Sequence, residues 1–149
     1  MKILLAVDGS DCSEAATKEI ANRPWPEGSE IRVLSVIEPS ATPMAEAWAL
    51  PDNYWEEAER AAKEHARAVI DKSLSALSMK RPAGLTVTSE IVRGNSRDAI
   101  LSEAERWGAD LIVVGSHGYS GMKKLWLGSV SQAVAAHARC SVEIVRRHQ

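Results

Sequence analysis

Five short segments rich in leucine, isoleucine and valine recur along the chain. Apolar runs of this length are typical of strands buried in a parallel sheet. The last segment alternates apolar and polar residues, as a half-exposed edge or interface strand does. The predicted strands are Lys2–Val7, Glu30–Ile37, Leu85–Val92, Leu111–Val114 and Ser141–Arg146.

Between these segments, apolar residues recur at the spacing of three and four that marks one face of an α-helix. The predicted helices are Ser13–Arg23, Asn53–Ser78, Ser96–Trp107 and Ser129–Ala138. Residues 39–51 contain three prolines and form a predicted loop, which we expect to be the most mobile element. Trp48 and Trp55 flank the end of this loop, and we interpret them as core anchors of the second helix.

The predicted order of elements is therefore βαβαβαβαβ, in one domain that spans residues 1–149. Strands that alternate with helices predict an α/β fold, in which a five-stranded, mainly parallel sheet has helices on both faces. In such sheets ligands bind beyond the carboxyl ends of the strands, where the strand order reverses. The first strand runs into Asp8 and the fourth into Gly115, so we expect a site between these two ends.

Composition narrows the class of protein. About 45% of the residues are hydrophobic and 26% are charged, which is ordinary for a globular domain. A formal net charge of −2 gives no electrostatic reason to expect nucleic acid or an anionic membrane as a partner. No apolar run approaches the roughly 18 residues of a spanning helix, and the N-terminus lacks the pattern of a signal peptide. Cys12 and Cys140 have no metal-ligand spacing, so we expect reduced thiols and a cytoplasmic protein.

The most informative stretch runs from Leu111 to Ser131 and is rich in glycine. Glycines just after a buried strand let backbone N–H groups approach a ligand without an intervening Cβ. The Gly128-Ser129 pair then begins a helix, whose unpaired N–H groups and positive dipole end attract anions. The stretch therefore predicts an anion site, most plausibly for the phosphates of a nucleotide.

Two common phosphate-binding motifs do not fit this stretch. A Walker A loop needs Lys and then Ser or Thr after its second glycine, but Gly121 is followed by Met122. The dinucleotide motif G-x-G-x-x-G is absent from the first strand-to-helix turn, which reads Asp8-Gly9-Ser10-Asp11. The spacing present is instead Gly115-x-x-Gly118, nine residues, Gly128-Ser129.

This spacing closely resembles the motif G-x-x-G, nine residues, G-[ST] of the ATP-binding branch of the universal stress protein family. The resemblance covers the whole chain, from Val7-Asp8 at the end of the opening strand to the closing segment Cys140–Val145. It implies a Rossmann-like fold of the adenine nucleotide alpha hydrolase type. It also implies a regulatory protein of the stress response that binds ATP, AMP or ADP, with Mg²⁺ as an open question.

The resemblance also implies which residues contact the nucleotide. The first and second strands would supply the adenine pocket, and the glycine-rich stretch would hold the ribose and the phosphate chain. The residues implied are Ala6, Val7, Asp8, Val36, Gly115, Ser116, His117, Gly118, Gly128, Ser129, Val130 and Ser131. The chemistry of these residues agrees with this assignment. Asp8 offers acceptors, Val36 offers an apolar wall for a ring, and Ser129 and Ser131 offer hydroxyl donors to anionic oxygens.

Several alternatives remain open from the sequence. Slow ATP hydrolysis at the same site would make the protein an enzyme, but only Asp8 and His117 lie near the motif as candidates, and no catalytic triad or metal cluster surrounds His117. The pocket could instead take another adenylate such as cAMP, which some relatives bind. The resemblance further implies a homodimer through the final strand, Val142–Arg146.

Overall fold

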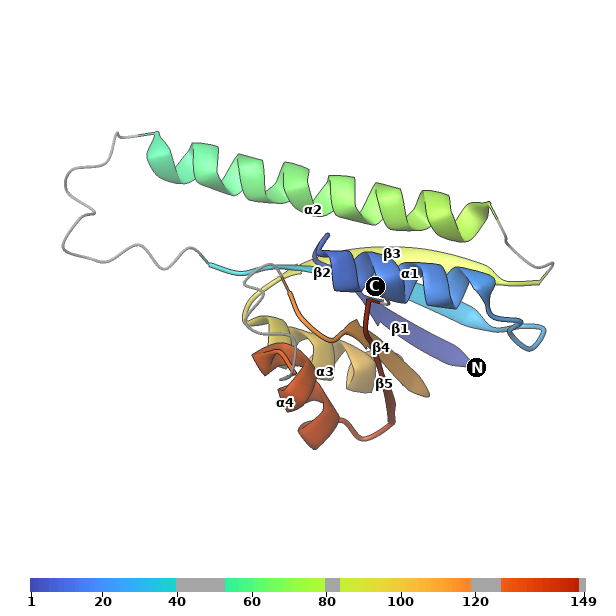
Figure 1. Cartoon of the computed structure of the whole chain (residues 1–149). Coiled ribbons are helices and arrows are strands. Elements are labelled where there is room, and N and C mark those ends of the chain that lie inside the picture. The colour runs from blue at the N-terminus through green and yellow to red at the C-terminus, as the bar shows by residue number, and fades with distance from the viewer. Residues whose placement is uncertain (40–52, 80–83, 119–126, 148–149) are drawn as a thin grey trace.

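The computed structural model describes residues 1–39, 53–79, 84–118 and 127–147. Strands and helices alternate along the chain as predicted (Figure 1). The strands are β1 (Lys2–Ala6), β2 (Glu30–Ile37), β3 (Thr86–Arg93), β4 (Leu111–Gly115) and β5 (Ser141–Val145). The helices are α1 (Asp11–Asn22), α2 (Tyr54–Ser78), α3 (Ser96–Trp107) and α4 (Ser129–His137).

The strands form one five-stranded sheet in the order β3-β2-β1-β4-β5, and every pair of neighbours is parallel. The central strand β1 pairs with β2 through Leu5 and Val33, and with β4 through Leu5 and Val113. All three of these side chains are fully buried. A strand with neighbours on both edges and helices on both faces has little exposed surface, which explains the apolar run Ile3–Ala6 of β1.

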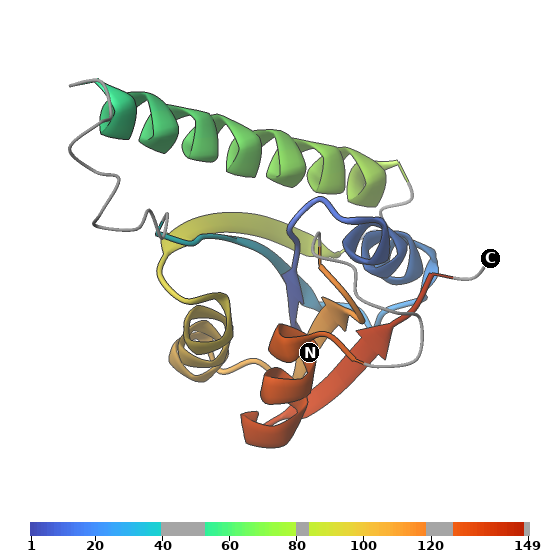
Figure 2. The same cartoon turned by 60° about the vertical axis from the view of Figure 1, so that its left-hand side comes forward.

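Helices cover both faces of the sheet, as predicted (Figures 1 and 2). On one face α1 and α2 contribute Ile20 and Ile70 to a core that includes Ile3 and Leu5 of β1. On the other face α3 and α4 pack a second core around Leu4. Because neighbouring residues of β1 point to opposite faces, one strand anchors both layers.

Capping residues set the helix boundaries. The helix α1 begins at Asp11, two residues before the predicted start, because the side chain of Ser10 accepts a hydrogen bond from the N–H of Ser13. Asn95 caps α3 in the same way. Gly108 ends α3 in the left-handed conformation, with φ of 71°.

The helix α2 is the longest and contacts the body along only part of its length. Its buried residues, Ala66, Val69, Ile70, Ser73 and Leu77, follow helical spacing and all lie in its C-terminal half. Trp55 at its start is 47% exposed, so its interpretation as a core anchor is wrong. Trp48 and the predicted loop from residue 40 onward lie outside the described residues.

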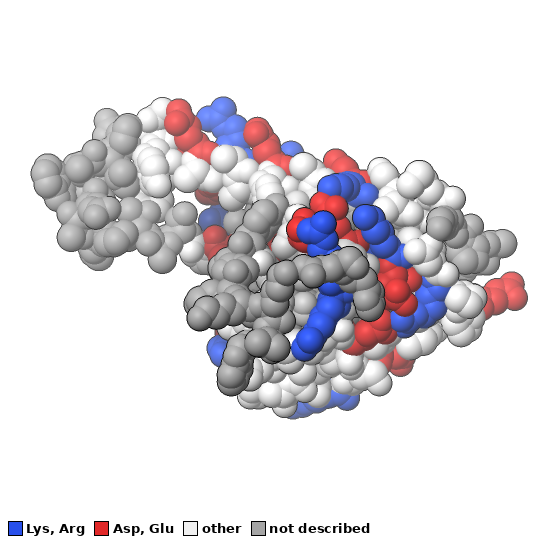
Figure 3. All heavy atoms as spheres, viewed as in Figure 1, with Lys and Arg blue, Asp and Glu red and all other residues white. Residues whose placement is uncertain are grey.

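None of the helices within the described ranges is long and apolar enough to cross a membrane. On the face shown in Figure 3, acidic and basic side chains are interspersed. Charged side chains also pair across elements, as Arg23, the residue after α1, does with Glu143 of β5 at 2.7 Å. Charges of both signs therefore balance locally on this face.

Candidate functional site

The strand order reverses between β1 and β4, and a cleft lies at the carboxyl ends of these two strands. The chain leaves β1 toward α1 on one face and leaves β4 toward α4 on the other. The cleft consists of an inner cavity of about 150 Å³ and an adjoining outer cavity of about 680 Å³. This is the place that the sequence predicts for the site.

The structure brings together residues from three distant parts of the chain around the inner cavity. All the predicted site residues except Ser116 line it: Ala6, Val7, Asp8, Val36, Gly115, His117, Gly118, Gly128, Ser129, Val130 and Ser131. Ser116 is 2% exposed and lies behind this lining. Its carbonyl accepts a hydrogen bond from the N–H of Gly128 at 2.8 Å, which joins the end of β4 to the start of α4.

Two glycines of the motif lie at close contacts within the protein. A Cβ on Gly115 would lie 2.8 Å from the backbone of Cys12 and Ser13, at the start of α1. A Cβ on Gly118 would lie 2.8 Å from Oδ2 of Asp8. The absence of side chains therefore lets β4 pack against α1 and lets the Gly118 segment approach the Asp8 carboxylate. The sequence predicts that these glycines let a ligand approach the backbone, but it does not indicate their contacts with α1 and with Asp8.

The N-terminus of α4 has no side-chain cap. Its N-cap residue is Gly128, whose N–H donates to the carbonyl of Ser116. The first residue of the helix, Ser129, is exposed. The hydroxyl of Ser131 shares its one hydrogen between the carbonyls of Ser116 and Gly128, at 3.1 and 2.9 Å. The residues of the first turn line the inner cavity, and among the described residues no side chain caps their N–H groups, an arrangement that suits an anion.

The N-terminus of α3 borders the outer cavity but already has its acceptors. Asn95 caps it, and Oε1 of Glu38 accepts from the N–H of Ser96 at 2.9 Å. Ser96, Arg97, Asn95, Glu38 and His65 line the outer cavity, and none of them was predicted as a site residue. The predicted turn before Ser96 also follows the carboxyl end of a strand, and that position could have indicated them.

His117 lies close to two serines, Ser116 and Ser10. Its Nδ1 is 3.1 Å from Oγ of Ser116, and its backbone carbonyl lies 3.2 Å from Oγ of Ser10. The Nε2 atom is buried and has no hydrogen-bond partner among the residues that the structure describes. Within the same ranges, no group of three or more His, Cys, Asp or Glu side chains gathers as a metal site would.

The fold and the cleft define a Rossmann-like α/β protein whose cavity lies at the switch point of a parallel sheet. Comparison with known proteins narrows this class. The profile of the Universal stress protein family matches residues 1–146. A match over nearly the whole chain shows that the chain belongs to the universal stress protein family.

Two curated relatives illustrate the range of similarity. The universal stress protein in the QAH/OAS sulfhydrylase 3′ region of Thermus aquaticus is 33% identical over 144 residues, which cover 97% of each chain. Universal stress protein YxiE of Bacillus subtilis is 29% identical over 148 residues, which cover 97% of this chain and 98% of YxiE.

Solved structures share the same architecture. The protein MJ0577 of Methanocaldococcus jannaschii superposes with a TM-score of 0.82 at 28% identity, over 99% of this chain and 96% of that one. An Arabidopsis thaliana family protein with AMP bound has a TM-score of 0.69 at 18% identity, over 99% and 92% of the two chains. Universal stress proteins in complex with cAMP and, from Archaeoglobus fulgidus, with dAMP have TM-scores of 0.63 and 0.64 at 21% and 19% identity. Each covers 97% of this chain, and the matches span 95% and 97% of those chains.

Proposed function

We propose that this protein is a regulatory protein of the universal stress response that binds an adenine nucleotide, with ATP as its main ligand. The observation that carries the proposal is the N-terminus of α4, which lines the inner cavity at the switch point and has no side-chain cap among the described residues. The family membership and the AMP, cAMP and dAMP held by structural neighbours support an adenylate in this cavity.

The residues divide the proposed site into two halves. Asp8 and Val36, with Ala6 and Val7, form the nucleoside half, in which the carboxylate accepts hydrogen bonds and Val36 packs against the base. The segment Gly115–Gly118 lies beside the ribose and the first phosphate. The backbone of Gly128–Ser131 binds the phosphate chain through the helix N–H groups. The hydroxyl of Ser129 is the serine donor left for a phosphate, because that of Ser131 is already engaged.

ATP acts in this proposal as a ligand that sets the state of the protein. A ligand shifts a conformation or a choice of partner by binding one state more tightly than another. Hydrolysis would additionally require a group that positions water, and usually Mg²⁺ near the phosphates. Asp8 and His117 are the side chains near the motif that could take part.

The first experiment is to identify the nucleotide that co-purifies with the protein, by mass spectrometry after denaturation. Calorimetry then compares ATP, ADP, AMP and cAMP, each with Mg²⁺ and with EDTA. We expect binding of ATP that Asp8→Ala weakens, and no turnover above that of the Asp8→Ala variant. Failure to bind ATP, ADP or AMP at millimolar concentration would reject the proposal. Tighter binding of cAMP than of ATP would favour the cyclic nucleotide, and turnover lost in the variant would indicate an ATPase.

The proposal extends to assembly and location. Among the described strands β5 pairs with β4 alone, so its other edge is free to pair with the same strand of a second copy. The homodimer would form along residues 142–146. We also place the protein in the cytoplasm, where its two free cysteines, Cys12 and Cys140, would stay reduced.

A further inference from the structure

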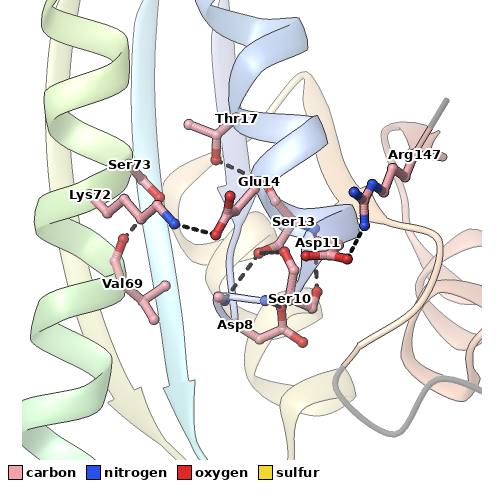
Figure 4. A network of polar contacts seen from close by, with 11 residues as sticks. Asp8, Ser10, Asp11, Ser13, Glu14, Thr17, Val69, Lys72, Ser73 and Arg147 are labelled. Carbon is pink, nitrogen blue, oxygen red and sulfur yellow. Dashed lines mark hydrogen bonds and ion pairs between the residues drawn. The ribbon is translucent and has the colours of Figure 1, made fainter. Parts of the chain in front are cut away.

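Ser10 lies in the cleft between the Asp8 carboxylate and the backbone of His117. It is the N-cap of α1, it is 7% exposed, and it lines the inner cavity. Figure 4 shows it between Asp8 and the first turn of α1. Sequence reasoning assigned it only to the turn after the first strand.

Two groups of Ser10 bind the same oxygen of Asp8. The N–H donates to Oδ1 at 2.9 Å, and the hydroxyl donates to Oδ1 at 2.6 Å (Figure 4). Two donors on one oxygen fix the rotation of an exposed carboxylate that would otherwise turn freely. Oδ2 is then the oxygen left toward Gly118, where a Cβ would lie 2.8 Å from it.

The same hydroxyl reaches the glycine-rich segment. Its oxygen lies 3.2 Å from the carbonyl of His117, and it accepts the N–H of Ser13 at 3.3 Å. A serine hydroxyl carries one hydrogen, and the shorter contact to a charged acceptor is the stronger bond. The hydroxyl therefore donates mainly to Asp8. The carbonyl of His117 lies close to the same hydroxyl, so Ser10 also contacts the glycine-rich segment.

We propose that Ser10 is a positioning residue that sets the affinity for the nucleoside by holding the Asp8 carboxylate with Oδ2 toward the ligand. Oδ2 accepts a hydrogen bond from a ribose hydroxyl or from the amino group of the base. This inference rests on the proposed function, because it concerns the same cleft. Ser10 acts through Asp8, and its contribution vanishes when the carboxylate is absent.

The test is a double-mutant cycle with Ser10→Gly, Asp8→Ala and the double variant, read by calorimetry with AMP and ATP. Glycine is tolerated at an N-cap, so Ser10→Gly removes the hydroxyl while costing α1 little. We expect Ser10→Gly to weaken both ligands by roughly tenfold, and to change affinity by less than about twofold in the Asp8→Ala background. Ser10→Thr restores the hydroxyl and should restore wild-type affinity, and urea unfolding of each variant confirms that it is folded.

Each result bears on the inference. An equal loss in both backgrounds would show that Ser10 acts independently of Asp8 and would overturn it. A larger loss for ATP than for AMP would place its effect on the phosphate half, through His117, and would also overturn it. Failure of the wild-type protein to bind either nucleotide would reject the proposed function and this inference together, whereas normal binding with no effect of Ser10→Gly rejects this inference alone.

Discussion

Gly118 illustrates how one missing side chain shapes the cleft. A Cβ at this position would lie 2.8 Å from Oδ2 of Asp8, and Oδ1 is already held by Ser10. We predict that Gly118→Ala displaces the carboxylate and lowers nucleotide affinity by at least about tenfold. The free energy of unfolding should change by less than about 1 kcal/mol, because the end of a side chain can move aside. Calorimetry and urea unfolding measure the two effects.

Gly115 provides the matched control three residues earlier in the chain. Its Cβ would lie 2.8 Å from backbone atoms of Cys12 and Ser13, which cannot move without shifting α1. Gly115→Ala should therefore destabilise the fold by about 1–3 kcal/mol, as overpacking does. If Gly115→Ala left the urea midpoint unchanged while Gly118→Ala lowered it, the assignment of the two glycines would be reversed.

Ser29 is a buried hydroxyl without an evident purpose. It is 0% exposed, and its Oγ has no hydrogen-bond partner among the described residues. Removing an unsatisfied buried polar atom relieves its desolvation cost, so Ser29→Ala should stabilise the protein by about 1 kcal/mol. Ser131→Ala is the control, because that buried hydroxyl makes two bonds and its loss should destabilise. Urea unfolding of both variants checks the opposite signs.

At the scale of single residues, the sequence predicts which residues lie together in the cleft but not which contacts and hydrogen bonds their atoms make. Asp8 could be predicted because it follows a buried strand whose end must face the cleft. The contact between Gly115 and α1 could not, since it joins residues about a hundred positions apart. The sequence also cannot indicate that the hydroxyl of Ser131 lies 3.1 Å from the carbonyl of Ser116, because only the fold brings that carbonyl close.

At the scale of elements, two helix starts that look alike in sequence differ in the structure. Both α3 and α4 begin near serines after a strand, and both border the cleft. The N–H groups at the start of α3 bond to Asn95 and Glu38, whereas no side chain of the described residues caps the start of α4. The order of elements could be predicted because periodicity is a local property. Whether the first N–H groups of a helix find an acceptor depends on distant residues, such as Glu38, which follows β2 and accepts from the N–H of Ser96.

Trp55 shows the same limit within one helix. The apolar stripe of α2 begins at Ala58 in the sequence, but the buried residues begin only at Ala66. Periodicity indicates which face of a helix is apolar, while the extent of its contact depends on where the sheet beneath it ends. Trp55 lies beyond this contact and is 47% exposed.

An ion-pair network ties α3 to the β2–β3 side of the sheet. The Glu103 side chain is 4% exposed, and it accepts from Arg32 at 2.5 Å and from Arg106 at 2.9 Å. Burial raises the pKa of the Glu103 carboxyl, but the hydrogen bonds and charges of the two arginines outweigh burial and leave the pKa below its ordinary value. Glu103 therefore contributes stability that is present above the pKa of the unfolded chain and is lost as pH falls through the folded-state pKa.

We predict that Glu103→Gln lowers the free energy of unfolding by about 1–3 kcal/mol at neutral pH. The difference from the wild type should shrink as pH falls below about 4.3, where the carboxyl of the unfolded chain becomes protonated. Urea unfolding from pH 7 to pH 3 measures this difference. A difference that stayed constant across the range would show that the charge of Glu103 does not carry the stability.

At the scale of the whole molecule, α1 connects the cleft to the free edge of the sheet. Its first residue, Asp11, pairs with Arg147 beyond β5, as Figure 4 shows, and Arg23 just after its last turn pairs with Glu143. Glu14 of the same helix pairs with Lys72 of α2. The turn that contains Asp8 and Ser10 therefore adjoins a helix fastened to both β5 and α2.

Dimerisation through β5 is the prediction that belongs to this scale. The carbonyl of Val145 and the N–H of Ser141 bond toward β4, so the alternation along a parallel strand points the N–H groups of Val142 and Ile144 outward. We expect the wild type to sediment as a dimer and Ile144→Pro to sediment as a monomer, because proline removes an outward N–H yet is tolerated in edge strands. Ile144→Ala is the control, since it loses more of the side chain's packing but keeps the N–H, and it should remain a dimer.

These three species separate pairing from packing. Circular dichroism establishes that each variant is folded, so that a monomer reflects the lost edge and not unfolding. If both variants became monomers, side-chain packing and not strand pairing would hold the dimer together. A wild type that sedimented as a monomer at every concentration would reject the dimer outright. Because the edge and the cleft share α1, the wild type measured with and without ATP also tests whether ligand binding changes the dissociation constant of the dimer.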